Sequence, residues 1–339
     1  MGQASVRCAL AGNYSKNGLL TNIDHRLRKW MIPVSQQVIV SRKYGLFSNV
    51  YSVLGAIDWC ELNNEIAVIK FDSGPYHDPA RGENWWDHYF EWPAGLVMGS
   101  RFTEVPKRTE AEEFASEMAL RLLTNRFRTS EIIAAYVRPR SEILESVEEL
   151  WREKVGDTFC IGVHVRGTDK FNEAPPVPFD LICATVENIV RRVPIPWRLY
   201  VATDEVNILE NFQSRFGACV ACQSAVRSLN GEPIHDPENP QAGPYRLAVE
   251  AIVDAYCLSR SSVFIGCQSN LSFFAAAIDP ATPWINMSPG SQVVNVNLHQ
   301  QLIAKEVVIR SLLARISERK ISNRFRRLFR KQDRVPGDV

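Results

Sequence analysis

The sequence lacks a long apolar run: no stretch approaches the roughly 18 residues that a membrane-spanning helix requires. It also lacks an excess of either charge, because 39 Lys and Arg residues face 38 Asp and Glu residues. That balance is not typical of a chain that binds nucleic acid over its whole surface. The first residues, Met1 to Arg7, lack the apolar segment of a signal peptide, and Val6 stands where a myristoylation signal requires Ser or Thr. We therefore expect a cytoplasmic protein.

Motifs for metal and dinucleotide binding are also scarce. The eight cysteines are scattered, and their one close pair, Cys219 and Cys222, has no second pair and no flanking histidine. We therefore expect neither a zinc site nor a redox site at this pair. We also expect the thiols to stay reduced in the cytoplasm. No three-glycine fingerprint follows the first predicted strand, which argues against a nicotinamide-dependent enzyme.

A chain of 339 residues is long enough for two domains of ordinary size. In the second half, apolar strands alternate with amphipathic helices, a pattern typical of a doubly wound parallel sheet in an α/β protein. The strands are predicted at 159–165, 198–202, 218–221, 263–265 and 284–287, and the helices over 179–193, 206–216, 245–259 and 269–278.

The first half carries a similar but shorter unit. Its predicted elements are strands at 38–40 and 66–71, a helix over 50–62, and two further helices over 109–136 and 141–154. Ser48 or Asn49 would cap the first helix. Gly45 and the cations Arg42 and Lys43 lie in the loop before it, so the start of this helix can receive a phosphate or a carboxylate.

The segment 73–106 is irregular and rich in rings. Two interpretations stay open: the rings bind the apolar faces of a sugar beside polar groups, or a long loop is packed down by its own aromatic side chains. The side chains concerned are Tyr76, His77, Trp85, Trp86, His88, Tyr89, Phe90 and Trp92.

The stretch 158–173 organises the rest of the chain. Its first half is apolar and β-branched, as in a buried parallel strand. Its second half is abruptly polar, with His164, Arg166, Thr168, Asp169 and Lys170 within seven positions. Such a strand delivers polar groups to the carboxyl edge of a sheet, where ligands bind in open α/β folds. Two cations beside a hydroxyl and a carboxylate suit a sugar nucleotide; the alternative is a solvated corner held by an Asp–Arg pair.

Two further strands end in polar residues, and in a parallel sheet these ends share one edge. Thr203 and Asp204 follow one strand, and the stretch 266–270 follows the other. Ser269 or Asn270 would cap the helix that starts there, and its N–H groups can hold a phosphate. This convergence favours a binding site over a solvated corner.

The chain becomes basic and amphipathic after 309. Between 310 and 334, ten Lys and Arg residues face two acidic residues, with apolar residues at nearly helical spacing. A helix of this kind is typical of a membrane-surface element. The alternative is a helix that packs its apolar side on the protein, and nucleic acid is a distant third interpretation.

The stretch from Ile161 to Lys170, Ile-Gly-Val-His-Val-Arg-Gly-Thr-Asp-Lys, closely resembles the first peptide motif of the α-1,6-fucosyltransferases. These include a bacterial nodulation enzyme that fucosylates chitin oligosaccharides and the animal enzyme that fucosylates the N-glycan core. The protein O-fucosyltransferases are more distantly similar. Residues 201–204 resemble the second motif, 244–278 the third, and 41–52 the family's N-terminal loop and helix.

The resemblance implies a GT-B arrangement, in which two Rossmann-like domains face a cleft. It places an N-terminal acceptor-side domain at 1–155, a nucleotide-sugar-binding domain at 156–305 and the basic tail at 306–339. It further implies an inverting transfer from GDP-fucose without a divalent metal or other cofactor. The sequence contains no Asp-x-Asp triplet, the usual metal–nucleotide anchor of the other large glycosyltransferase fold. Fixed cations and helix N-termini would then meet the charge on the leaving diphosphate.

By the same resemblance Arg166 is the essential cation, and a guanidinium can grip two phosphate oxygens at once. Asp169 and Lys170 would organise the loop, and Lys170 adds positive charge. Glu173 is the predicted base on the acceptor hydroxyl, with Asp204 and Glu83 in reserve. Donor contacts are expected from His164, Arg166, Thr168, Thr203, Asp204, Asp254, Ser269, Asn270 and Gly45.

Two departures from the family pattern bear on specificity. Gly167 stands where several members carry a second arginine, which affects the acceptor linkage. Leu271 replaces a polar residue and Cys267-Gln268 is unusual, so the nucleotide base and the sugar could differ. We expect fucosyl transfer to an oligosaccharide or a lipid-linked glycan, with the tail at the inner membrane face. The alternatives are a transferase for another nucleotide sugar and a non-catalytic glycan-binding scaffold.

Overall fold

The structure is a computed structural model that describes residues 36–40, 44–63, 66–92, 97–98, 119–167, 177–234 and 242–287. All of these belong to one compact unit that begins at Gln36. The predicted basic tail, 306–339, lies outside the described residues.

The first sheet has three parallel strands in the order β1 (Gln36–Val40), β2 (Ile66–Lys70) and β3 (Val97–Met98). The helix α2 (Leu46–Asn63) connects β1 to β2. It begins four residues before the predicted start, so the prediction that Ser48 or Asn49 caps it is wrong. Both residues lie in the first turn and donate their N–H groups to the carbonyl of Gly45. The buried side chains of Leu46 and Phe47 explain the earlier start, because they extend the apolar face of the helix.

The aromatic segment is mainly a packed loop. It contains a 3-10 turn, η2 (Pro79–Arg81), and the short helix α3 (Trp86–Tyr89). Trp85, Trp86, Tyr89 and Phe90 are fully buried, so for these rings the packed-loop interpretation is confirmed.

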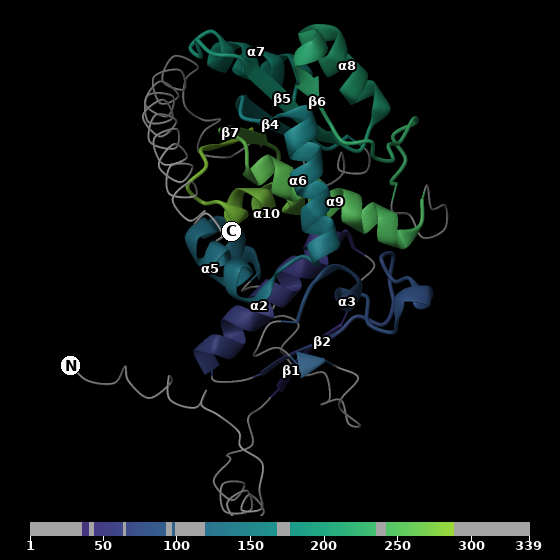
Figure 1. The fold of residues 1–339 in the computed structure, drawn as a ribbon. Coiled ribbons are helices and arrows are strands. Elements are labelled where there is room, and N and C mark those ends of the chain that lie inside the picture. Colours follow the sequence, from purple (N-terminus) through teal and green to yellow (C-terminus); the bar gives the residue numbers. More distant parts are fainter. Residues whose placement is uncertain are drawn as a thin grey trace, which may run out of the picture. The chain divides into compact units, whose positions relative to one another are not determined.

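The second sheet has five parallel strands in the order β6-β5-β4-β7-β8. Its strands are β4 (Phe159–Val165), β5 (Trp197–Thr203), β6 (Val220–Ala221), β7 (Val263–Gly266) and β8 (Trp284–Asn286). Figure 1 labels β4, β5, β6 and β7 among them. The predicted α/β class with a parallel sheet is confirmed. Among these strands the prediction errs most at β6, because a 3-10 turn, η5 (Gly217–Cys219), takes the place of its first residues.

Helices connect these strands. They are α7 (Phe179–Val190), α8 (Val206–Phe216), α9 (Pro244–Ser259) and α10 (Asn270–Ile278), and α5 (Arg126–Tyr136) and α6 (Ser141–Lys154) precede the sheet. Side chains alternate along β4, as a pleated strand requires. Ile161 and Val163 pack with α7 and α8 in one cluster, whereas Cys160 joins a larger cluster with α9 and α10.

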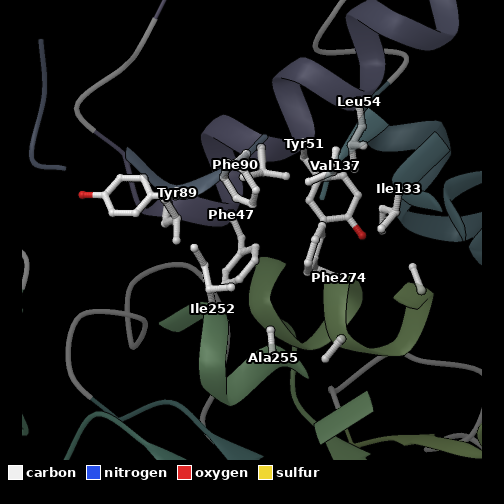
Figure 2. Close-up of a cluster of buried hydrophobic side chains, with 14 of the residues drawn as sticks. Phe47, Tyr51, Leu54, Tyr89, Phe90, Ile133, Val137, Ile252, Ala255 and Phe274 are labelled. Atoms are coloured by element: carbon white, nitrogen blue, oxygen red, sulfur yellow. The ribbon is translucent and has the colours of Figure 1, made fainter. Parts of the chain in front are cut away.

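The larger cluster also includes α2 (Figure 2). Phe47 of α2 meets Phe274 of α10, with ring centroids 4.7 Å apart. Tyr51 and Leu54 continue the buried face of α2, and Ile252 contributes from α9. Burial of these side chains fixes the start of α2 beside α9 and α10, and this contact shapes the candidate site.

Candidate functional site

The strand order of the second sheet reverses at β4, because β5 lies on one side of it and β7 on the other. Such a reversal opens a crevice outside the carboxyl ends of the strands, where α/β proteins bind ligands. Val165 at the end of β4 pairs with Thr203 of β5. Val163, two residues earlier, pairs with Ile265 of β7. The polar residues that follow the three strands therefore meet at one edge, as predicted.

A cavity of about 420 Å³ lies at this edge. Side chains from the start of α2, the ends of β4 and β5, the helix α9 and the start of α10 line it. Eight predicted site residues are among them: Gly45, His164, Arg166, Thr203, Asp204, Asp254, Ser269 and Asn270. Thr168, Asp169, Lys170 and Glu173 lie outside the described residues, as do the loop cations Arg42 and Lys43.

Arg166 directly follows β4 and is the cation among the described residues that line the cavity. Its Nε lies 3.7 Å from Oδ2 of Asp204, and the two side chains are 20% and 17% exposed. Oδ1 of Asp204 accepts a hydrogen bond of 3.0 Å from the N–H of Gly167. The carboxylate of Asp204 therefore contacts the residues that follow β4. The other reserve base, Glu83, is exposed and is not part of the cavity wall.

His164 is buried at the end of β4. Its Nδ1 lies 2.7 Å from Oγ of Ser272 and 3.9 Å from Sγ of Cys267. Burial, with the nearby charge of Arg166, lowers the pKa of His164 to about 3. The ring is therefore neutral at physiological pH, and it can offer hydrogen bonds to a ligand but no charge.

Asp254 supplies a buried carboxylate to the cavity wall. It lies on α9, and its Oδ1 accepts a hydrogen bond of 2.7 Å from the hydroxyl of Tyr200. Burial raises the pKa of Asp254 to about 6, although that hydrogen bond and the charge of Arg227 act in the other direction. At neutral pH the ionised form therefore predominates, and it can accept hydrogen bonds from N–H donors of a ligand.

Two helix N-termini open onto the cavity. Ser269 is the N-cap residue of α10, as predicted, but its side chain makes no capping hydrogen bond. Leu46, Phe47 and Ser48 from the first turn of α2 also line the cavity. The first N–H groups of a helix have no partner within the helix and carry partial positive charge. The two helix ends together with Arg166 therefore favour an anion such as a diphosphate.

Sequence reasoning missed part of the cavity wall. Glu250 lies one helical turn before Asp254 on α9, and this spacing could have identified it. Its Oε2 accepts a hydrogen bond of 2.9 Å from the N–H of Val226, which fixes the loop across the cavity. Tyr44 is 57% exposed at the cavity and Tyr76 is buried there; only Tyr76 was among the rings considered for sugar binding.

The described residues contain no group of three or more His, Cys, Asp or Glu side chains placed to hold a metal ion. No helix in the described ranges is both long enough and apolar enough to cross a membrane.

Comparisons with curated proteins and with solved structures both find relatives in the family that the motif at 161–170 resembles. Nodulation protein Z of Sinorhizobium fredii (strain NBRC 101917 / NGR234) is 26% identical over 132 residues, which cover 36% of this chain and 39% of that protein. The match thus spans well under half the length of this curated relative. No protein-family model matches the chain.

The fold is similar to solved structures of NodZ. A crystal structure of NodZ α-1,6-fucosyltransferase co-crystallised with GDP has a TM-score of 0.52 and 16% identity, and covers 74% of this chain and 94% of that one. A second, soaked with GDP-fucose, has a TM-score of 0.51 and 17% identity, with coverages of 73% and 93%. At this identity the likeness shows the fold. The resemblance to the fucosyltransferase family that the sequence motifs indicate is confirmed.

Proposed function

We propose that this chain, which resembles the NodZ fucosyltransferases in sequence and fold, is a glycosyltransferase that moves L-fucose from GDP-fucose to an oligosaccharide or a lipid-linked glycan. One observation carries the proposal. Eight residues chosen from four separate stretches of sequence line a single cavity, in which Arg166, two helix N-termini and the buried carboxylate of Asp254 meet. GDP and GDP-fucose are the ligands named for the similar structures.

The proposed arrangement is GT-B. The sheet β1–β3 would belong to an N-terminal Rossmann-like domain over 1–155, and the sheet β4–β8 to a doubly wound nucleotide-sugar domain over 156–305. The parallel strand order β6-β5-β4-β7-β8 supports the second of these. The basic tail, 306–339, would hold the protein at the inner face of the membrane through residues 310–334.

The donor would lie along the cavity. The diphosphate would bind near Arg166 and the starts of α10 and α2, where positive charge gathers. The guanine would lie toward Asp254, whose carboxylate suits the N–H donors on the edge of that base. His164 would contribute hydrogen bonds from a neutral ring.

The proposed transfer inverts the anomeric centre. An acceptor hydroxyl oxygen attacks C1 of fucose from the face opposite the diphosphate, and the bond between C1 and the phosphate oxygen breaks. GDP leaves with the bonding electron pair, and the proton of the hydroxyl passes to a base, for which Glu173 is the candidate. Arg166 and the helix N-termini would stabilise the charge that develops on GDP, so the proposal requires no metal.

Nucleotide-dependent thermal stability tests the donor. A ligand that binds only the folded protein stabilises it by about 2.7 kcal/mol at a hundred times its Kd. We expect GDP to raise the melting temperature, and UDP, CMP and dTDP to leave it unchanged. A rise with UDP or dTDP would support a transferase for another nucleotide sugar. No rise with any nucleotide would support the scaffold alternative.

Transfer itself tests Arg166. We expect R166A to lose two activities: fucosyl transfer to chitin oligosaccharides and the slow hydrolysis of GDP-fucose. Its circular dichroism should be unchanged. The matched control is R191A, because Arg191 is exposed at the C-terminal end of α7 and is not among the described residues that line the cavity. Its guanidinium donates to the carbonyl of Glu187 and to Oδ1 of Asn188. Activity in R166A equal to that of R191A would contradict the site.

A further inference from the structure

The ends of β4 and β5 place two acidic residues beside the proposed phosphate cation. The strands pair in parallel register up to Val165 and Thr203. The next residues, 166–167 after one strand and 204–205 after the other, therefore leave the sheet side by side. The sequence motifs indicate Asp204 as a donor ligand or a reserve base and do not single out Glu205.

Asp204 joins the two residues that follow β4. Its Oδ1 accepts the N–H of Gly167 at 3.0 Å, and its Oδ2 lies 3.7 Å from Nε of Arg166. Both ion-pair partners are mostly buried, so solvent and salt screen the pair less than a surface pair. Asp204 is itself held in place, because its backbone carbonyl accepts a hydrogen bond of 2.7 Å from the N–H of Ser228.

Glu205 fixes the same corner by packing. A Cβ atom on Gly167 would lie 2.4 Å from Cδ of Glu205 and within 2.7 Å of both carboxylate oxygens. The carboxylate therefore occupies the space where any side chain at position 167 would begin. Glu205 pairs with Ser228 in an isolated parallel bridge, and its N–H donates to Oγ1 of Thr203 at 3.3 Å. The backbone that carries this carboxylate is thus restrained on both sides.

We infer that Asp204 and Glu205 are positioning residues that fix the guanidinium of Arg166 for a diphosphate. Asp204 sets the side chain through Nε and anchors Gly167, while Glu205 holds the backbone of Gly167 against the sheet. An arginine side chain loses rotational freedom about several bonds when it binds a ligand. If the side chain is already fixed, this entropy loss is smaller and the affinity for the ligand is higher. The inference rests on the proposed function, because it assumes that Arg166 binds the donor diphosphate.

The ratio of the dissociation constants of GMP and GDP isolates the contribution of the second phosphate. We expect this ratio to fall about tenfold in D204N, because the amide does not carry the negative charge that pairs with Nε of Arg166. R166A should lower it further, and D204N should add nothing in an R166A background, since Asp204 acts through Arg166. Isothermal titration calorimetry on the full chain measures all four ratios.

The matched control is E250Q. Glu250 lines the same cavity, and its carboxylate also accepts from one backbone N–H and one arginine. Its Oε2 accepts from the N–H of Val226, and its Oε1 accepts from Nε of Arg246 at 2.7 Å, so neither contact involves Arg166. Its substitution should change the affinities for GMP and GDP by the same factor. An unchanged ratio in D204N, or tighter binding of GDP than in the wild type, would overturn the inference alone. A wild type that does not distinguish GDP from GMP would overturn the proposed function as well.

The packing of Glu205 is tested by substitution at both positions. G167A should lower the same ratio, because its methyl group displaces the Glu205 carboxylate and shifts the neighbouring Arg166. E205A should also lower the ratio, because the backbone of Gly167 loses the carboxylate that packs against it. The double variant G167A/E205A should be no lower than E205A, since its methyl group no longer meets the carboxylate. Lower ratios in both single variants support the inference, whereas an E205A ratio or a G167A ratio equal to that of the wild type overturns the role of Glu205.

Discussion

Asp254 and His164 are both buried against the same cavity, and burial shifts their pKa values in opposite directions. Burial penalises the charged form of each group, which raises the pKa of the carboxyl to about 6 and lowers that of the imidazole to about 3. At neutral pH the carboxylate is therefore ionised at an energetic cost and the histidine is neutral. A ligand that donates hydrogen bonds to Asp254 would offset that cost, which is why this residue suits the N–H edge of a nucleobase.

The raised pKa of Asp254 predicts a pH dependence of stability. The folded protein binds the proton of Asp254 more tightly than the unfolded chain, whose carboxyl has a pKa of 3.8. The stabilising contribution is therefore complete below pH 4 and is lost as the pH rises through about 6. Relative to D254N, the wild type should lose about 3 kcal/mol of unfolding free energy across this window. Urea unfolding of both proteins between pH 4 and 8 measures the difference, and a flat difference would contradict the assignment.

At the scale of elements, α10 is held at its C-terminal end. Its first turn opens onto the cavity, and its last turn is fixed by Arg126 of α5. The Nε of Arg126 donates to the carbonyl of Ala276 at 3.1 Å, and its Nη2 donates to those of Pro280 and Thr282 at 2.6 and 3.0 Å. A cation at the C-terminal end of a helix also interacts favourably with the helix dipole. The position of the candidate phosphate-binding end of α10 thus depends on a residue about 150 positions earlier.

Removal of this guanidinium should destabilise the fold. We expect R126M to cost about 2–4 kcal/mol of unfolding free energy, because several buried carbonyl groups lose a charged donor. R126K keeps the charge but can reach fewer carbonyls, so it should lie between R126M and the wild type. Chemical denaturation gives both values. A cost below about 0.5 kcal/mol for R126M, the size of an ordinary surface substitution, would contradict this role.

At the scale of the whole described unit, one core joins the two sheets. The larger hydrophobic cluster contains Phe47 beside the first sheet and Phe274 beside the second, whereas Phe212 belongs to the separate cluster under α7 and α8. No polar boundary divides the larger cluster among the described residues. The two sheets should therefore unfold together.

Hydrogen exchange tests this cooperativity. F274A should cost about 3–5 kcal/mol, and it should speed exchange of the amides of β2 and β4 by the same factor. F212A is the discriminating variant, because Phe212 packs in the smaller cluster between the second sheet and the helices α7 and α8. If the unit is cooperative, F212A also speeds exchange in β2. Faster exchange confined to the second sheet would show two independently unfolding parts.

The sequence alone predicted most elements of the second sheet and the shared edge at which the candidate site lies. Apolar strands with clear polar ends and helices bounded by Gly or Pro follow from local periodicity, so β4, α8 and α9 were predicted to within a residue. Because parallel strands share one carboxyl edge, the polar residues after β4, β5 and β7 could be assigned to one site from their positions in the sequence.

Only the tertiary structure shows which of these side chains contact one another. Local sequence does not show that Glu205 fills the space beside Gly167, that Asp204 anchors Arg166, or that Tyr200 bonds to Asp254 across 54 positions. The earlier start of α2 depends on burial of Leu46 and Phe47 against distant helices. Such contacts arise from chain segments far apart in sequence, and their energies depend on packing and desolvation that exist only in the folded protein.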